Sequence, residues 1–300
     1  MGFKKNEFTT IVEQASLAVP GFQESYRKFH QEAIIGQNSS SFVENYGRSA
    51  AHIALHFGVS PEKLDAEQVN SYLYYLSVHE NYAESYFKCM VFGMRYWFRL
   101  FGMEDKALRM PPIKKKDTLP VVLSKEECKK LFTAPRMLKH RFLLAMAYSG
   151  GFRMNELRHL KISDIDIDRM QIRIRQGKGN KDRYVVLSKV IKNGLEKYYA
   201  QYKPEVYVFN GQHQGELMGE RSIQYVINEA VQKAGIQKAV SMHTLRHSYA
   251  THLLEDGIDL FSIKKLLGHS DIRTTLVYLH VAQIKTHLAH SPLDSLYGQK

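Results

Sequence analysis

Apolar side chains recur at helical spacing through the first hundred residues of the chain. Residues 3–35 read as one or two helices of mixed polarity, and Ser40 or Ser41 then caps a helix whose apolar positions include Tyr46 and Ile53. Two further helical patterns cover residues 60–80 and 83–102, and the second carries many aromatic side chains. Most of these aromatics are expected to lie in a core. The pattern therefore predicts a small helical domain.

A basic, proline-containing stretch, KALRMPPIKKKDTLPVVLSKEE, follows this domain. Proline lacks a backbone donor and disfavours helix in the residue before it, so the stretch is expected to be an extended linker. Its lysines have two readings. They either solvate a loop or contact a phosphate backbone, and the run consists of Lys114, Lys115 and Lys116.

The second half of the chain is again mainly helical, with one β-hairpin. Ser124 followed by Glu127 has the spacing of a capping box, and an apolar helix over residues 140–152 ends at a pair of glycines. Over residues 170–188, apolar and charged positions alternate around the turn GKGNKD, which predicts a hairpin. From about residue 222 to residue 285 the pattern returns to helices. The basic side of the hairpin is expected to carry Arg173, Arg175, Lys181 and Arg183.

Charge and composition narrow the class of partner. The 300 residues suggest about two domains of roughly 150 residues each, and the net charge of +12 points to a polyanion. No apolar run reaches the ~20 residues of a membrane span, and the first residues lack the apolar segment of a signal peptide. The two cysteines fit a reducing cytoplasm and argue against a disulfide framework. Nucleic acid in the cytoplasm is the leading expectation.

Five histidines lie between residues 241 and 280, which raises the question of a metal site. His243 and His247 are four residues apart, as in a metalloprotease helix, but Thr244 stands where that motif needs glutamate. We therefore expect no metal. His252 and His280 are expected to be structural.

Other residues suggest phosphate chemistry, although each also has a plain explanation. His243 and Arg246 are neighbours on one helix face and could grip phosphate oxygens, because a guanidinium matches phosphate geometry. Arg153 follows the glycine pair, with Glu156 either forming a surface salt bridge or orienting Arg153. Lys178, at the tip of the hairpin, could donate a proton to a leaving oxygen.

The ordered series GGFRMNEL, GKGNKDR, HTLRH, LGHS and TTLVYLH resembles the tyrosine recombinase family, the phage-integrase and Xer-type site-specific recombinases. The resemblance covers residues 118–285, and residues 40–105 look more loosely like the helical core-binding domain of the family. It implies a mainly α fold with a small β-sheet, in which a helical SAM-like domain and an α+β catalytic domain form a C-shaped DNA clamp. The expected divisions are an N-terminal extension (1–38), the core-binding domain (39–106), a linker (107–120), the catalytic domain (121–285) and a tail (286–300).

The resemblance also implies roles for individual residues. Tyr278 would be the nucleophile that forms a 3′-phosphotyrosyl link, and Lys178 would protonate the leaving 5′-oxygen. Strands would exchange through a Holliday junction, without metal, ATP or cofactor. Glu156 and His247 would support the remaining catalytic residues, which are Arg153, His243, Arg246 and His269. Asn155 and Phe152 depart from the commoner residues of the motif, but neither is a catalytic position.

The implied partner is double-stranded DNA with inverted-repeat sites, bound by a tetramer in the cytoplasm, at the nucleoid. The basic hairpin and the linker lysines would contact the DNA backbone, and the tail over 286–300 would dock on a neighbouring subunit. A partner recombinase or an accessory DNA-bending protein stays open. Two rival readings also remain: a helix-turn-helix regulator built on residues 249–270, and a type IB topoisomerase that cleaves without recombining.

Overall fold

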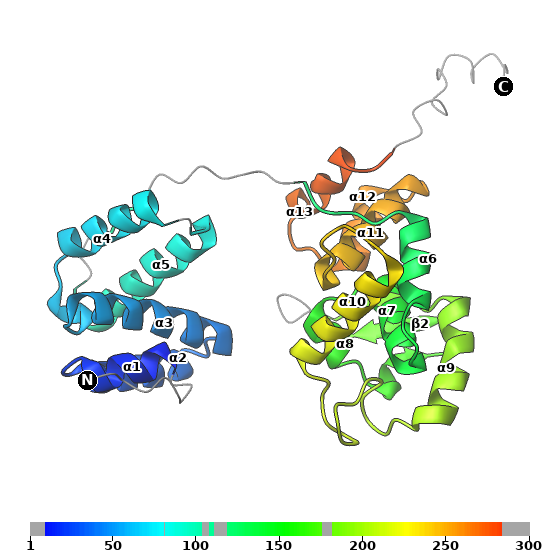
Figure 1. The fold of residues 1–300 in the computed structure, drawn as a ribbon, viewed down its shortest axis with the longest axis horizontal. Coiled ribbons are helices and arrows are strands. Elements are labelled where there is room, and N and C mark those ends of the chain that lie inside the picture. The colour runs from blue at the N-terminus through cyan, green and yellow to red at the C-terminus, as the bar shows by residue number, and fades with distance from the viewer. Residues whose placement is uncertain (1–9, 81, 104–107, 111–118, 176–181, 284–300) are drawn as a thin grey trace, which may run out of the picture. The chain divides into compact units, whose positions relative to one another are not determined.

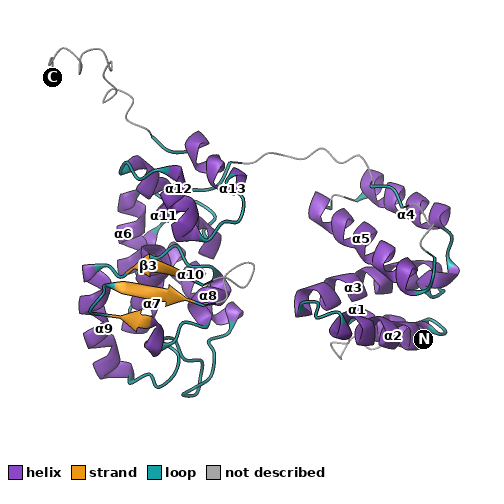
Figure 2. Cartoon of the chain, turned by 180° about the vertical axis from the view of Figure 1, so that it is seen from behind, coloured by secondary structure: helices purple, strands orange, loops and turns teal. Residues whose placement is uncertain are grey.

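The computed structural model describes residues 10–80, 82–103, 108–110, 119–175 and 182–283. The chain forms two compact units, residues 1–117 and 118–300, which are described separately (Figure 1). Within the described residues the protein is mainly α-helical with a single three-stranded sheet, as the sequence predicted (Figure 2). None of the described helices is both long and apolar enough to cross a membrane.

The first unit is a bundle in which α3 packs against α1, α2 and α5. The sequence placed the N-cap of α3 at Ser40 or Ser41, but the cap is Ser39, whose hydroxyl accepts a hydrogen bond from the backbone N–H of Phe42. The helix expected over residues 60–80 is divided, because Asp65 caps a new helix after a short 3₁₀ turn. The elements are α1 (Ile11–Ala18), α2 (Phe22–Ile35), α3 (Ser40–Phe57), η1 (Pro61–Lys63), α4 (Ala66–His79) and α5 (Glu84–Leu100).

Aromatic side chains form the centre of the first unit. Trp97 on α5 is fully buried and stacks on Phe22 and Phe29 of α2, with ring centroids 5.9 and 5.3 Å apart. Its indole N–H donates to the Glu62 carboxylate at 3.0 Å, so the polar end of the buried ring is satisfied. The helices before and after residue 38 therefore share one core.

The second unit surrounds the apolar helix α7, which packs against α6, α9 and α11. The described strands form an antiparallel sheet in the order β1-β2-β3, with Ile172 opposite Val185 (Figure 2). Its first elements are α6 (Lys125–Thr133), α7 (Leu138–Ser149), α8 (Met154–Arg158), η2 (Ile162–Asp164), β1 (Ile165–Asp166), β2 (Gln171–Ile174) and β3 (Arg183–Val186). They are followed by α9 (Lys189–Tyr202), α10 (Glu220–Ala234), α11 (Met242–Glu255), α12 (Leu260–Leu267), α13 (Arg273–Leu276) and η3 (Val277–His280).

The capping box at Ser124 and Glu127 and the β-hairpin are confirmed, but the placement of one hairpin arginine is wrong. Arg183 was expected on the basic, DNA-facing side. It instead shares the inward face of β3 with Val185, and only 8% of its surface is exposed. Alternation along a strand sends residues 183, 185 and 187 to the same side, so Arg183 points into the protein with its apolar neighbours.

A small apolar cluster carries the C-terminal segment of the described chain. Tyr249 and Ala250 of α11, Ile263 and Leu267 of α12, and Tyr278 of η3 pack together and are buried. This cluster holds the segment around Tyr278 against the surface of α11.

We expect Val226→Ala in α10 to lower the free energy of unfolding of the second unit by about 2 kcal/mol, because the substitution removes two buried methyl groups and leaves a cavity. Val226 is 1% exposed. Val190→Ala in α9 is the matched control, since Val190 is 78% exposed and should stay within about 0.5 kcal/mol of wild type. Urea denaturation followed by circular dichroism measures both, and equal losses would contradict this packing.

Candidate active site

A glycine turn between α7 and α8 positions the first arginine of the site. Gly151 has a positive φ of 56°, and a Cβ there would lie 2.5 Å from the ring of Tyr249. Only glycine fits both the backbone conformation and the space. Two residues later, Arg153 occupies the N-cap position of α8, and its backbone N–H donates to the Glu156 carboxylate. The turn therefore brings Arg153 against the helix that carries Arg246.

Glu156 lies at the centre of a cluster of arginines. Its carboxylate accepts hydrogen bonds from the backbone N–H and Nη1 of Arg153, both at 2.7 Å. It also accepts hydrogen bonds from both terminal nitrogens of Arg183, at 2.6 and 2.8 Å. Nη1 of Arg246 lies 3.9 Å from the same carboxylate. We call these four residues the arginine cluster. Because the Glu156 side chain is only 6% exposed, the surface salt bridge considered above is excluded.

The protonation of Glu156 follows from this environment. Burial acts to raise its pKa, but the hydrogen bonds and charge of Arg183, together with the bonds from Arg153, lower the pKa to about 2. The carboxylate is therefore ionised throughout the physiological range. One negative charge holds three guanidinium groups in place, so the cluster has a surplus of positive charge.

Arg183 is a member of the site that the sequence reading missed. Besides its paired bonds to Glu156, its Nε donates to the carbonyl of Leu266 at 2.8 Å. A Cβ on Gly268 would approach its Cδ to 3.0 Å, so the chain after α12 passes close to this side chain. Arg183 thereby joins β3, α8 and the end of α12. The sequence could have indicated this, because Arg183 has the same two-residue spacing as the buried Val185 and Leu187 and therefore lies on the same face.

Arg246 is fixed by backbone carbonyls from two other parts of the unit. It is 3% exposed, and its terminal nitrogens donate to Gly151 at 2.6 Å and Leu267 at 2.5 Å. Burial, followed by the positive charge of Arg153, lowers its pKa to about 10. Arg246 thus keeps its charge at neutral pH while having almost no freedom to move.

Tyr278 lies next to this positive charge. It is 1% exposed, and its hydroxyl is 3.1 Å from Nδ1 of His247. Burial raises the pKa of the phenol, and the charges of Arg246 and Arg153 act in the opposite direction. The structure therefore brings Tyr278, His247 and two predicted catalytic arginines together.

The other predicted histidines differ in surroundings. Nδ1 of His269 lies 2.9 Å from the hydroxyl of Thr275, which is buried on α13 and precedes Tyr278 by three residues. This contact ties His269 to the tyrosine-bearing segment. His243 is exposed on α11, with its ring centroid 6.3 Å from that of His247. His252 bonds the Tyr148 hydroxyl and the Leu123 carbonyl, in agreement with the structural role expected for it.

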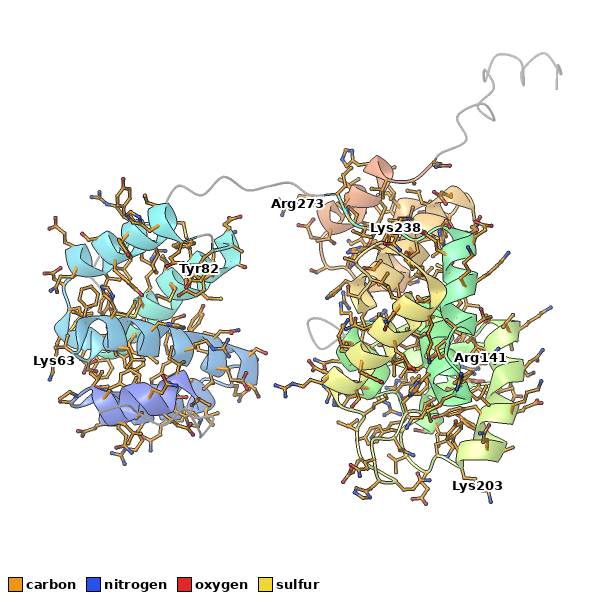
Figure 3. The ribbon with its side chains drawn as sticks, viewed as in Figure 1. Lys63, Tyr82, Arg141, Lys203, Lys238 and Arg273 are labelled. Carbon is orange, nitrogen blue, oxygen red and sulfur yellow. The ribbon has the colours of Figure 1, made fainter. Side chains whose placement is uncertain are left out.

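Of the predicted DNA-contacting residues that the structure describes, Arg183 belongs to the arginine cluster, whereas Arg173 and Arg175 pair with other carboxylates. Arg173 pairs with Asp182 at 2.6 Å, and Arg175 pairs with the buried carboxylate of Asp164 at 2.5 Å. Another exposed cation, Arg273 on α13, pairs with Asp271 (Figure 3). Among the described residues no group of three or more histidine, cysteine or acidic side chains is arranged to hold a metal ion. The predicted residues outside the described ranges are Lys178, Lys181, Lys114, Lys115 and Lys116.

A cavity of about 1280 Å³ opens beside His269. Residues of β3 line one side of it, and residues of α12 and the following loop line the other, among them Lys264 and Lys265. The lining carries both signs of charge, because Asp182 and Asp259 lie in it together with the two lysines.

Comparison with known proteins identifies relatives that are similar in sequence over the second unit and part of the first. Residues 121–284 match the model of the phage integrase family. A putative integrase/recombinase of Sinorhizobium fredii, y4qK, is 34% identical over 254 residues, which cover 84% of this chain and 82% of the relative. Tyrosine recombinase XerA of Thermococcus kodakarensis is 36% identical over 205 residues, or 67% of this chain and 72% of the relative.

The fold is also found among solved structures. A lambda integrase tetramer bound to a Holliday junction has a TM-score of 0.65 to this chain at 16% identity, with 96% of this chain and 84% of that one covered. At this identity the likeness concerns the fold alone. The family match covers more than half of the chain and spans all the elements that build the site. The chain thus belongs to the phage integrase family and is a tyrosine-type site-specific recombinase.

Proposed function

We propose that the chain cuts and rejoins DNA through a 3′-phosphotyrosyl intermediate on Tyr278 and a Holliday junction, without metal, ATP or cofactor. The observation that carries the proposal is the position of the Tyr278 hydroxyl, which is bonded to His247 and lies in the field of Arg246 and Arg153. A buried phenol beside fixed positive charge is well placed to attack a phosphodiester.

In the proposed reaction the Tyr278 oxygen attacks phosphorus as the bond from phosphorus to the 5′-oxygen breaks. Lys178 gives its proton to that oxygen, so a neutral 5′-hydroxyl leaves. A 5′-hydroxyl from the partner strand later attacks the phosphotyrosine and releases the tyrosine. Because the covalent link conserves the phosphodiester bond energy, rejoining needs no external energy source.

The arginine cluster would stabilise the transition state. Negative charge grows on the non-bridging oxygens as the phosphorane forms, and Arg153 and Arg246 would neutralise it. Arg153 keeps 23% of its side chain exposed and is the more accessible of the two. Glu156 would position both arginines, and His243 and His269 would add hydrogen bonds to the phosphate.

The DNA partner would be a duplex with inverted-repeat sites, bound by a tetramer. The positive net charge of +12 and the tetramer on a Holliday junction in the lambda integrase structure support this assignment. Arg173 and Arg175 would contact the DNA backbone, and the tail over residues 286–300 would dock on a neighbouring subunit. We keep the five divisions expected from the sequence as the proposed organisation, with the extension (1–38) sharing the core of the core-binding domain (39–106), and propose that the protein acts in the cytoplasm, at the nucleoid.

Two rival functions make different demands on Tyr278. A helix-turn-helix regulator would use α11 and α12 for binding and would not need the tyrosine. A type IB topoisomerase would need it, but would not exchange strands between paired sites. The convergence of Tyr278, Arg153 and Arg246 favours strand cleavage over regulation.

Tyr278→Phe should abolish the covalent complex, because the variant lacks the attacking oxygen while the ring still fills its pocket. The wild-type chain, mixed with nicked suicide DNA carrying candidate sites from beside its own gene, should give an SDS-resistant complex in EDTA. Gel electrophoresis measures the complex.

The same DNA should still bind Tyr278→Phe in a mobility-shift assay, which separates loss of chemistry from loss of folding. Strand exchange between two paired sites then distinguishes recombination from topoisomerase action. A complex that survives in Tyr278→Phe would refute the proposed nucleophile.

Glu156→Gln should lower stability by on the order of 3 kcal/mol and slow cleavage about 100-fold, because the guanidinium groups lose their common carboxylate. The pKa of Glu156 is lowered by folding, so its contribution is present above about pH 4.5 and is lost as the pH falls towards 2. Urea denaturation across this range should therefore show a weaker pH dependence in the variant.

Glu220→Gln is the matched control for Glu156→Gln. Glu220 also pairs with an arginine, Arg158 at 2.6 Å, but its side chain is 57% exposed. An exposed pair contributes about 1 kcal/mol or less, so both stability and cleavage should stay close to wild type. Equal effects of the two substitutions would contradict the positioning role of Glu156.

Replacing Lys114, Lys115 and Lys116 by glutamine should weaken DNA binding and reduce its salt dependence. Each lost phosphate contact lowers the slope of log affinity against log salt by about 0.9, so three contacts remove up to about 2.7. Fluorescence anisotropy over a series of salt concentrations measures the slope. An unchanged slope would show that the lysines only solvate the linker.

A further inference from the structure

The proton of the nucleophile needs an acceptor. An ordinary phenol has a pKa of about 10, and burial raises that of Tyr278 further. At neutral pH the tyrosine is therefore protonated, and a neutral phenol is a weak nucleophile. A base within hydrogen-bonding distance of the phenolic oxygen would remove this obstacle as the new bond forms.

His247 meets the geometric condition. Its Nδ1 lies 3.1 Å from the Tyr278 oxygen, and the two ring centroids are 5.7 Å apart. His247 comes from α11 and Tyr278 from η3, and these two elements are in direct contact. The contact is therefore made between two packed segments and is not a chance meeting of mobile side chains.

The charges around the pair set the direction of the hydrogen bond. Arg246 and Arg153 both act on the Tyr278 oxygen, and positive charge is attracted to its lone pairs. The phenolic hydrogen then points away from the arginines, towards Nδ1 of His247. Nδ1 is the acceptor in this arrangement, so the proton of the neutral ring is carried on Nε2.

Burial and the positively charged groups around His247 favour its neutral form, which can accept a proton. Burial lowers its pKa, and the neighbouring His243 and Arg246 lower it further. Among the described residues, Tyr278 faces the ring directly, and Arg153 acts on the Tyr278 oxygen. His247 is accordingly neutral at physiological pH, which is the state that a base requires.

We propose that His247 is a catalytic residue of the strand-cleavage reaction, accepting the phenolic proton of Tyr278 on Nδ1 as the tyrosine oxygen attacks phosphorus. This inference rests on the proposed function, in which Tyr278 is the nucleophile. The O–H bond of Tyr278 breaks and an N–H bond forms on His247, while the bond to the 5′-oxygen breaks and that oxygen takes a proton from Lys178. In rejoining, Lys178 takes the proton of the incoming 5′-hydroxyl, and the imidazolium returns its proton to the departing tyrosine.

This role goes beyond supporting the neighbouring Arg246. A supporting histidine would affect cleavage by the same factor whatever the acidity of the phenol. A proton acceptor is needed less when the phenol is more acidic. Acidity of the nucleophile therefore separates the two roles.

The test measures single-turnover cleavage of nicked suicide DNA by the full chain carrying either tyrosine or a fluorinated, more acidic tyrosine at position 278. We expect His247→Asn to slow cleavage 10²- to 10³-fold with tyrosine, because the asparagine oxygen can accept the hydrogen bond but cannot take the proton. With fluorotyrosine the deficit should shrink at least tenfold. The wild-type rate should also fall at acid pH as His247 becomes protonated, and His247→Asn should lose that dependence.

His280→Gln is the matched control, because His280 is exposed and lies two residues after Tyr278. It should keep the wild-type rate and pH profile. Thermal melting and DNA binding establish that each variant folds. If His247→Asn does not fold, His247→Gln is used for the same comparison.

The outcomes separate this inference from the proposed function. A deficit of equal size with tyrosine and fluorotyrosine, or an unchanged pH profile, would overturn the proton-acceptor role while leaving Tyr278 as nucleophile. Absence of any wild-type covalent complex on DNA that the chain binds, or its persistence in Tyr278→Phe, would refute the proposed function itself.

Discussion

The buried carboxylate of Glu156 is the interaction on which the rest of the site depends. Arg153, Arg183 and Arg246 come from the cap of α8, from β3 and from α11, and all three approach the same carboxylate. Burying three guanidinium groups without a counter-charge would be prohibitive, since even a well-paired buried ion gains little over its loss of hydration. The single carboxylate allows these three elements to meet with their charges inward.

Main-chain carbonyl groups bind the arginines in addition to Glu156. Gly151 and Leu267 accept from Arg246, and Leu266 accepts from Arg183, so the chain before α8 and the end of α12 are bound into the same network. Positive charge is thereby held in position before any substrate arrives. Electrostatic stabilisation is most effective when it requires no rearrangement at the moment of reaction, and the arginine cluster satisfies that condition.

Local features of the structure could be predicted from the sequence, whereas the long-range contacts could not. The Ser124 capping box and the β-hairpin depend on residues close together in the chain, and both were found. The helix α9 was overlooked, although Ser188 caps it and its buried residues Ile191 and Leu195 are four apart. The paired bonds of Arg183 to Glu156 join residues 27 apart, and strand alternation alone indicated only that Arg183 points inward. The resemblance selected the catalytic candidates and Glu156 as the partner of Arg153, but it did not indicate that Arg183 binds the same carboxylate.

The two sides of the site differ in how firmly they are held. The arginines are bound by charge-assisted hydrogen bonds, which are roughly twice as strong as neutral ones. The tyrosine-bearing segment is held by hydrogen bonds between side chains, Tyr278 with His247 and Thr275 with His269, by a bond from the backbone N–H of Gln283 to Glu255, and by the apolar contacts of Tyr278. Breaking the two bonds between side chains costs about 2 kcal/mol. The contact with His247 that holds Tyr278 in place is thus also the contact on the proposed path of its proton.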